Sequence, residues 1–234
     1  MRELFRKSEF ISSMLDFILP PLCLGCDEYC DNESNICDLC LNKIEEYEYP
    51  ICLNCNSTLT KIPCHFCKDK SLPVFIMGEY RFPLDEIIKQ FKFKGITHLS
   101  SFFSNLIISK YKTDILNLKA DCIVPVPLHY AREKERGYNQ AELMAKQISH
   151  ELNLPFRTDL IIRAKKRKPQ VKSKLSEREK NIKDVFQVIN KDEKLRIIIL
   201  DDVVTSGATM KEVANTLNKN NHKVVGAIAV AHSV

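Results

Sequence analysis

The sequence predicts an α/β protein: a mostly parallel sheet flanked by helices, preceded by a small cysteine-rich module. Apolar runs of strand length alternate with helical patterns from about residue 74 onward, as in sheets built from strand-helix-strand units. Four Cys-x-x-Cys pairs gather between residues 23 and 67, ahead of that pattern. We therefore expect an N-terminal amphipathic helix over residues 1–20, a zinc-binding module over 21–70 and the α/β domain over 71–234.

The first segment, residues 3–19, has apolar side chains at the spacing of a helix with a broad apolar face. Such a helix could lie on a membrane or a partner, but we favour packing against its own protein, which is the more common outcome. Polar residues interrupt the run from Phe10 to Leu19, so no cleavable signal is evident, and no apolar run is long enough to be a transmembrane segment. A reducing cytoplasm fits these features together with the many cysteines.

The cysteine-rich module has the spacing of zinc knuckles. Tetrahedral Zn²⁺ takes two Cys-x-x-Cys pairs, so four pairs can hold up to two structural ions. Sequential pairing of the knuckles is the simplest arrangement, and an interleaved one remains open. Metal binding is expected to supply much of the folding free energy, on the order of 10–16 kcal/mol per site. Cys30, Cys122 and His65 are expected to lie outside the metal sites. The expected ligands are Cys23, Cys26, Cys37, Cys40, Cys52, Cys55, Cys64 and Cys67.

The α/β part is divided by its apolar runs and helical patterns. The expected strands cover residues 74–80, the run that begins near 121, 159–162, 185–189, 197–200 and 224–230. The expected helices cover residues 83–93, 99–111, 136–151 and the segment from Thr209 to about 220. Gly95 separates the first two helices. Lys92 and Lys94, which end the first of them, either present cations toward a ligand or lie in solvent.

The most informative stretch follows the strand at 197–200. Two carboxylates stop the apolar run, and a small, hydroxyl-rich loop then leads into a helix. Ligands bind at the carboxyl ends of strands in open α/β sheets, and a helix N-terminus favours a phosphate. Carboxylates suit sugar hydroxyls, so the stretch predicts a ribose 5-phosphate site rather than an ordinary strand-to-helix corner. The expected site consists of Asp201, Asp202, Val203, Val204, Thr205, Ser206, Gly207, Ala208 and Thr209.

A second strand-loop-helix corner lies at residues 121–140. Two prolines stiffen the end of the strand, and a basic loop follows. Arginine side chains can bind phosphate oxygens bidentately, which makes pyrophosphate a plausible ligand. Taken alone, this basic loop would be interpreted as solvent-exposed. The ribose 5-phosphate motif makes an anion-binding role for the loop more plausible. The expected anion-binding residues are Arg132, Arg136, Gly137, Asn139 and Gln140.

These motifs together carry a family resemblance. The stretch from Asp201 to Thr209 closely resembles the binding motif for phosphoribosyl pyrophosphate (PRPP) in type I phosphoribosyltransferases. With the cysteine knuckles, Val-Pro-Val-Pro-Leu-His and Arg-Gly-Tyr-Asn-Gln, the chain resembles the ComF family of competence proteins from about residue 20 to 232. The resemblance implies a zinc-binding module fused to a type I phosphoribosyltransferase fold, PRPP bound with Mg²⁺, and a role in natural transformation by DNA uptake.

A basic segment separates the strands at 159–162 and 185–189. Residues 163–180 contain nine Lys or Arg and two Glu, a local charge of +7 in a chain of net charge +5. The resemblance implies a flexible hood over PRPP here; the charges also suit a DNA backbone, whereas the plain alternative is a solvated charge run. The candidate hood and DNA-binding residues are Lys165, Lys166, Arg167, Lys168, Gln170, Arg178 and Asn181.

Two functions remain open at this point. One is a cytoplasmic competence protein that binds PRPP or a similar ribose phosphate and handles single-stranded DNA, with DNA-uptake or recombination proteins as partners and an association with the inner face of the membrane through an uptake complex. The other is an active transferase of ribose 5-phosphate to an unidentified small acceptor, with Asp201 and Asp202 as tentative catalytic residues. Thr205 stands where purine-salvage enzymes carry an acid, which disfavours purine salvage. A purely structural adaptor would not need the acids and the hydroxyl loop together.

Overall fold

The computed structural model describes residues 20–32, 34–164, 185–190 and 194–233. The amphipathic helix expected before residue 20 lies outside the described residues. The candidate hood also lies outside them, with Lys165, Lys166, Arg167, Lys168, Gln170, Arg178 and Asn181. None of the described helices is long and apolar enough to cross a membrane.

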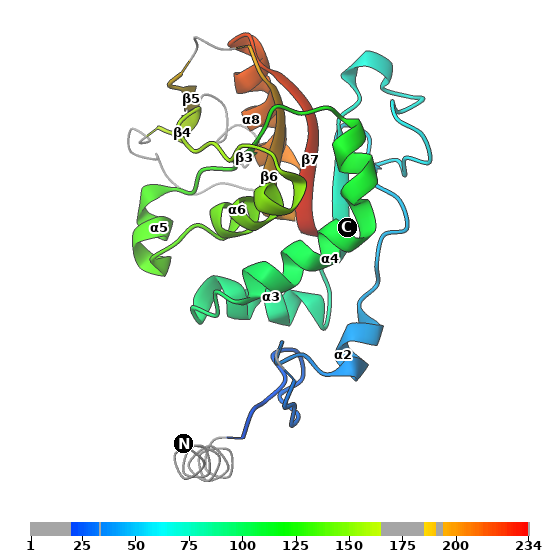
Figure 1. The fold of residues 1–234 in the computed structure, drawn as a ribbon, viewed down its shortest axis with the longest axis vertical. Helices are drawn as coiled ribbons and strands as arrows, with labels where there is room; N and C mark the ends of the chain where they lie inside the picture. Colours follow the sequence, from blue (N-terminus) through cyan, green and yellow to red (C-terminus); the bar gives the residue numbers. More distant parts are fainter. Residues whose placement is uncertain (1–19, 33, 165–184, 191–193, 234) are drawn as a thin grey trace, which may run out of the picture.

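The centre of the protein is a five-stranded sheet in the order β1-β2-β7-β6-β3 (Figure 1). Strands β2, β7, β6 and β3 run parallel, and only β1 at one edge is antiparallel. The buried strands are rich in Ile, Val and Ala, the composition expected of a parallel sheet covered on both faces. The bounds are β1 Ile51–Cys52, β2 Pro73–Glu79, β3 Cys122–Pro125, β6 Arg196–Val204 and β7 Lys223–His232. The predicted α/β class with a mostly parallel sheet is confirmed.

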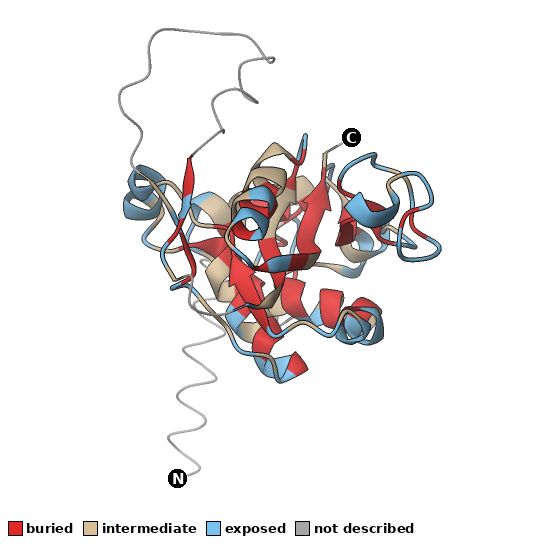
Figure 2. Cartoon of the chain, turned by 90° about the horizontal axis from the view of Figure 1, so that it is seen from above, coloured by how far each residue is buried: buried red, intermediate tan, exposed pale blue. Residues whose placement is uncertain are grey.

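Helices cover both faces of this sheet (Figure 1). Alternate residues of β6 separate the two layers: Ile198 and Leu200 pack with α3, α4 and α6, whereas Ile197 and Ile199 pack with α8. A small antiparallel hairpin, β4 with β5, packs on the α8 side. Buried residues accordingly fill the strands and the inner sides of the helices (Figure 2). The bounds are α3 Leu84–Phe93, α4 Leu99–Asn117, α6 Gln140–Leu152, α8 Ala208–Lys219, β4 Ile161–Arg163 and β5 Phe186–Val188.

Three elements differ from the sequence prediction. The basic stretch expected as a loop is a short helix, α5 (Tyr130–Arg136), which begins where the His129 ring accepts a hydrogen bond from the N–H of Ala131 and ends at left-handed Gly137. Helix α4 runs on to Asn117, because Ile115 continues its buried side. Strand β6 does not stop at the acids but pairs with β7 through Val204, so the carboxylates stand on the strand itself.

The cysteine-rich module is built onto the α/β domain at several places, including Glu46 and Tyr47, which contact Lys110 and Tyr111 of α4. Strand β1 pairs with β2 and thereby extends the main sheet. Helix α2 (Asp38–Lys43) belongs to the first half of the module, and its Cys40 packs in the same core cluster as α3 and α4. The second half ends in a 3₁₀ turn, Lys68–Lys70, just before β2. The domain boundary expected between residues 70 and 71 stays a prediction.

Candidate phosphate-binding edge and zinc centres

The hydroxyl-rich loop lies where β6 passes into α8. Gly207 caps this helix with φ of +69°, a left-handed conformation that glycine adopts without strain. Thr205 and Ser206 are exposed, whereas Gly207 itself is buried. The first N–H groups of α8 have no partner within a helix and carry the positive end of its dipole. The corner therefore offers exposed hydroxyls and backbone donors, the set of groups that holds a phosphate.

The two carboxylates stand just before this loop and are electrostatically coupled. Asp202 forms an ion pair with Lys92 of α3, with 2.9 Å between Oδ1 and Nζ, and its N–H donates to Asp201 Oδ1 at 2.9 Å. Burial and the neighbouring charge of Asp202 raise the pKa of Asp201 to about 7. Lys92 and Arg163 act in the opposite direction on the pKa of Asp201. Of the two sequence interpretations of Lys92, the structure favours the one in which it faces the site.

The predicted pyrophosphate residues fall into two groups. Arg132 is exposed on α5. Arg136 lies 5.1 Å from the centre of the Phe93 ring and donates to Gln140 Oε1 at 3.0 Å. Asn139 is buried and caps α6, accepting from the N–H of Ala141 and donating to a carbonyl of the preceding loop. In this conformation Arg132 is free to meet a ligand, while the buried amides support the corner.

Arg163, the last residue of β4, is a site residue that the sequence analysis missed. Burial and the charge of Arg132 lower the pKa of Arg163, whereas the charge of Asp201 raises it, so both charges act on its guanidinium. Its guanidinium stacks 5.5 Å from the centre of the Phe186 ring, and its buried Nε has no hydrogen-bond partner among the described residues. Its position directly after the predicted strand at 159–162 could have identified it as a site residue. Instead, it was grouped with the basic segment 163–180.

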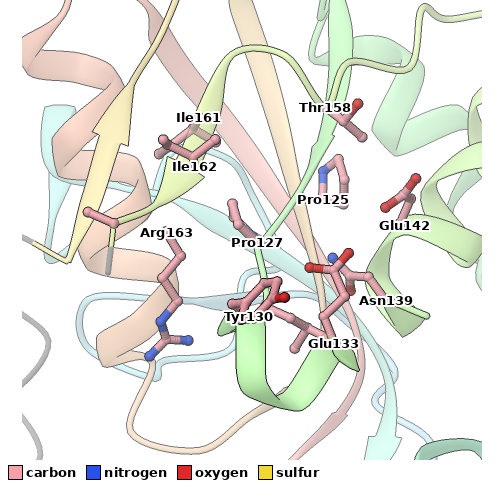
Figure 3. A pocket seen from close by; sticks show the side chains of 12 residues that line it. Pro125, Pro127, Tyr130, Glu133, Asn139, Glu142, Thr158, Ile161, Ile162 and Arg163 are labelled. Carbon is pink, nitrogen blue, oxygen red and sulfur yellow. The ribbon is translucent and has the colours of Figure 1, made fainter. Parts of the chain in front are cut away.

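A cavity of about 450 Å³ adjoins Arg163. Figure 3 shows that Arg163 extends toward the side of α5, where Tyr130 lies, while Glu133 and Glu142 face the cavity from the other side. Prolines from the end of β3 and isoleucines from β4 form its apolar walls. The cavity is large enough for a small organic molecule next to the predicted pyrophosphate loop.

The eight cysteines form two groups of four, paired sequentially: Cys23, Cys26, Cys37 and Cys40, then Cys52, Cys55, Cys64 and Cys67. All sulfur atoms of a group lie within 4.8 Å of one another. The distances Cys26–Cys37 and Cys55–Cys64 are 3.8 and 3.6 Å between Sγ atoms, close to the edge of about 3.8 Å of a zinc–sulfur tetrahedron with bonds of about 2.3 Å. Both groups fit structural zinc; exposed His65 and buried Cys30 and Cys122 belong to neither.

The environment of the thiols supports metal binding. Burial opposes ionisation of Cys23, yet N–H groups of Cys37, Gly25 and Cys26 lower its pKa to about 6. Hydrogen bonds from Ser57 lower the pKa of Cys55, also to about 6. Thiolates are the zinc-binding form, so these donors favour the ligand state of Cys23 and Cys55. In the same two groups, burial raises the pKa of Cys40, and hydrogen bonding with Cys55 raises the pKa of Cys67 to about 12, so bound metal has to displace those protons.

Each zinc centre approaches an element of the phosphate-binding edge. A Cβ on Gly207 would lie 2.9 Å from Leu53 Cδ1, so the residue after ligand Cys52 packs directly against the hydroxyl loop. A Cβ on Gly25 would lie 3.1 Å from Pro83, the cap of the helix that carries Lys92. The contact of Leu53 reaches the hydroxyl-rich loop itself, whereas the contact of Gly25 reaches the start of α3, at the other end of that helix from Lys92.

Comparison with known proteins agrees with this architecture. A phosphoribosyl transferase domain model matches residues 106–233, and a double zinc ribbon domain model matches residues 14–73. Competence protein F of Haemophilus influenzae is 30% identical over 80% of this chain and 86% of its own length. DNA utilization protein YhgH of Escherichia coli is 29% identical, over 83% and 87%. Competence protein ComFC of Bacillus subtilis is 28% identical, over 84% and 88%.

The family is thereby established. The chain belongs to the phosphoribosyl transferase domain family, and it is a homologue of the ComF competence proteins with a double zinc ribbon ahead of that domain. The resemblance predicted from the sequence motifs is confirmed over most of the chain.

Proposed function

From its place among the ComF homologues of the phosphoribosyl transferase family, we propose that this chain binds PRPP, or a similar ribose phosphate, and handles incoming single-stranded DNA during natural transformation. The observation that carries the proposal is the carboxyl edge of β6. There, paired acids precede a hydroxyl-rich loop at a helix N-terminus, and the charge of Arg163 acts on Asp201. We assign three parts to the chain: a helix over residues 1–20, a zinc module over 21–70 and the ligand-binding domain over 71–234.

Each part of PRPP has a counterpart at this edge. Asp201 and Asp202 accept hydrogen bonds from the ribose hydroxyls, and the loop from Thr205 to Thr209 holds the 5-phosphate. Arg132 and Arg163 bind the pyrophosphate, since guanidinium groups pair well with phosphate oxygens and the charge of Asp201 acts on Arg163. PRPP oxygens hold most of the coordination sphere of Mg²⁺, as is usual for this ion.

DNA handling rests on other observations. Relatives of this chain carry the names competence protein and DNA utilization protein. Residues 163–180 supply a local charge of +7, which suits a phosphate backbone. We place the protein in the cytoplasm, because cysteine thiolates persist as zinc ligands in a reducing compartment.

A second candidate function is transfer of ribose 5-phosphate from PRPP to a small acceptor. The cavity of about 450 Å³ beside Arg163 supports it, because an acceptor could enter there next to the pyrophosphate loop. The reaction would form a bond from the acceptor to ribose C1 and release pyrophosphate. Asp201 and Asp202 would then fix the ribose and stabilise its developing positive charge.

Calorimetry with PRPP, ribose 5-phosphate and pyrophosphate tests the binding site. We expect Asp202→Ala to weaken ribose 5-phosphate and PRPP by about 100-fold or more, because hydrogen bonds to charged groups are each worth about 1.5–3 kcal/mol. Arg163→Gln should weaken PRPP and pyrophosphate by about 10- to 100-fold and leave ribose 5-phosphate unchanged at a pH well above 7, where Asp201 is ionised with or without the charge of Arg163.

Asp121→Ala is the matched control, because this carboxylate binds the N–H of Arg196 at the opposite end of the same strand. It should change none of the three affinities. Absence of PRPP binding in the wild-type protein, or equal affinity in Asp202→Ala, would remove the ribose assignment. Sustained pyrophosphate release with an added acceptor would establish the transferase instead of a pure binding role.

A further inference from the structure

A groove of about 880 Å³ lies between the second zinc ribbon and helix α8, and its lining residues Leu53 and Lys211 also border Gly207 of the hydroxyl-rich loop. One wall comes from the ribbon and the segment that leads into β2, and the other from the outer side of α8 and the start of β7. Its lining includes Asn54, Phe66, Lys70, Lys211, Asn218 and Lys223.

Phe66 is the most exposed large apolar residue of this ribbon, with 76% of its surface accessible. It stands between zinc ligands Cys64 and Cys67, and the His65 ring packs edge-on against it at 5.6 Å between ring centres. The metal centre thus fixes an aromatic ring in solvent at the mouth of the groove. An exposed ring held in this way is a platform on which an unpaired base can stack.

The polar lining complements a phosphate backbone. Lys70, Lys211 and Lys223 come from the ribbon, from α8 and from β7, and Asp69 is the one acid among the described lining residues. None of the three ammonium groups forms a salt bridge with another described residue. Asn215 of α8 adds a hydrogen-bonding group, whereas Asn54 donates to the Lys70 carbonyl and Asn218 accepts from the N–H of Val224. Cations on both walls beside one aromatic ring match a single strand better than a duplex, whose bases are already stacked.

We propose that this groove is the binding track for single-stranded DNA, with Phe66 stacking on a base and the three lysines contacting successive phosphates. The inference rests on the DNA-handling part of the proposed function and assigns it to the zinc ribbon and α8 instead of to residues 163–180. It gives the second zinc centre a task in addition to folding, which is to present Phe66.

Fluorescence anisotropy with a labelled thymidine 15-mer tests the track. Phe66→Ala should weaken binding by about 5- to 100-fold, the usual cost of one lost base–aromatic stack. Lys70, Lys211 and Lys223 changed together to Gln should lower the slope of log affinity against log salt by about 2, since each phosphate contact on a single strand adds about 0.7. A blunt 15-base-pair duplex should bind more weakly than the single strand.

Two control variants and a zinc measurement keep the result specific. Phe82→Ala removes another exposed ring, and Lys146→Gln removes an exposed charge on α6; neither should alter binding. Elemental analysis should give the same zinc content in Phe66→Ala as in the wild type. If the wild type binds the 15-mer and the groove variants bind equally well, the track is wrong while DNA handling survives. If the wild type does not bind the 15-mer, both ideas fail but the PRPP assignment is untouched.

Discussion

The two zinc centres share their ligand chemistry but not their place in the protein. In the first, Cys23 and Cys40 are at most 2% exposed and pack in the main hydrophobic core with α3 and α4. In the second, Cys52 and Cys64 form a small core of their own with Leu59, and Cys55 is exposed. The first centre is continuous with the interior of the domain. The second is attached through strand β1 and through Ile51, Leu53 and Leu72, which pack in the core cluster of α8.

The difference also extends to how each centre reaches the ligand edge. The first contacts Pro83 at the start of α3, and Lys92 near the other end of this helix pairs with Asp202, so the first centre is joined to the acids only through the length of α3. The second packs Leu53 against Gly207, so its influence on the phosphate loop is steric. Two sites with identical ligands can therefore stabilise different parts of the domain, because the residues around the cysteines differ.

The largest expected effect is on stability after loss of one metal ion. Cys40→Ser should lower the melting temperature more than Cys55→Ser, because it also places a hydroxyl in the main core. Both variants should retain about one zinc per chain instead of two, since each group of four holds one ion. Circular dichroism melts with elemental analysis measure this. Equal melting temperatures would mean that the two centres contribute alike and that the contrast in their surroundings is irrelevant.

A smaller effect separates folding from ligand binding. Leu53→Ala and Ile36→Ala each remove a buried aliphatic side chain from one ribbon, 1% and 0% exposed, and each should cost about 2–5 kcal/mol of unfolding free energy. Only Leu53→Ala should also weaken ribose 5-phosphate, by about 3- to 10-fold, because only Leu53 contacts the phosphate loop. Urea unfolding and calorimetry on both variants give the comparison. Equal loss of affinity in the two would show a general loosening of the fold.

The smallest expected effect is a shift in pH dependence. Because the pKa of Asp201 is raised to about 7, ribose 5-phosphate should bind more tightly as the pH rises through that value and the carboxylate forms. Lys92→Met should move the midpoint upward, since Lys92 lowers the pKa of Asp201. Leu53→Ala should weaken binding at every pH without moving the midpoint. Titration of the ligand phosphate is common to all variants, so differences between profiles report on the protein.

The raised pKa of Asp201 also determines whether the free energy of unfolding rises or falls with pH. The folded protein retains a proton on Asp201 that the unfolded chain has lost between about pH 4 and 7. The contribution of this group to the free energy of unfolding therefore falls as the pH rises through that window. Asp201→Asn should remove this part of the pH dependence in urea titrations.

Much of the fold was predictable because its signals are local. The β-branched run of β6 and the acids and glycine after it lie within about a dozen consecutive residues. The cysteine spacing likewise restricts each ligand pair to one tight turn. Helix α5 was missed because it is only one or two turns long and its charged residues resemble a loop.

The remaining site features depend on contacts between distant segments. Arg163 reaches the site because β4 folds back beside α5, and the basic run after it concealed its separate position. The Lys92–Asp202 pair and the Leu53–Gly207 contact join residues more than 100 positions apart, a relation that no local pattern contains. Sequence reasoning could place the acids and the loop, but not the groups that neutralise, support and surround them.

Leu53 lines the groove proposed for DNA and also touches Gly207 of the phosphate loop. A shift of the Leu53 side chain would therefore change both the groove and the phosphate loop. If bound DNA changes the affinity for the sugar phosphate by some factor, bound sugar phosphate must change the affinity for DNA by the same factor. Leu53 would then link acceptance of incoming DNA to the supply of activated ribose, the precursor from which a cell makes its own nucleotides.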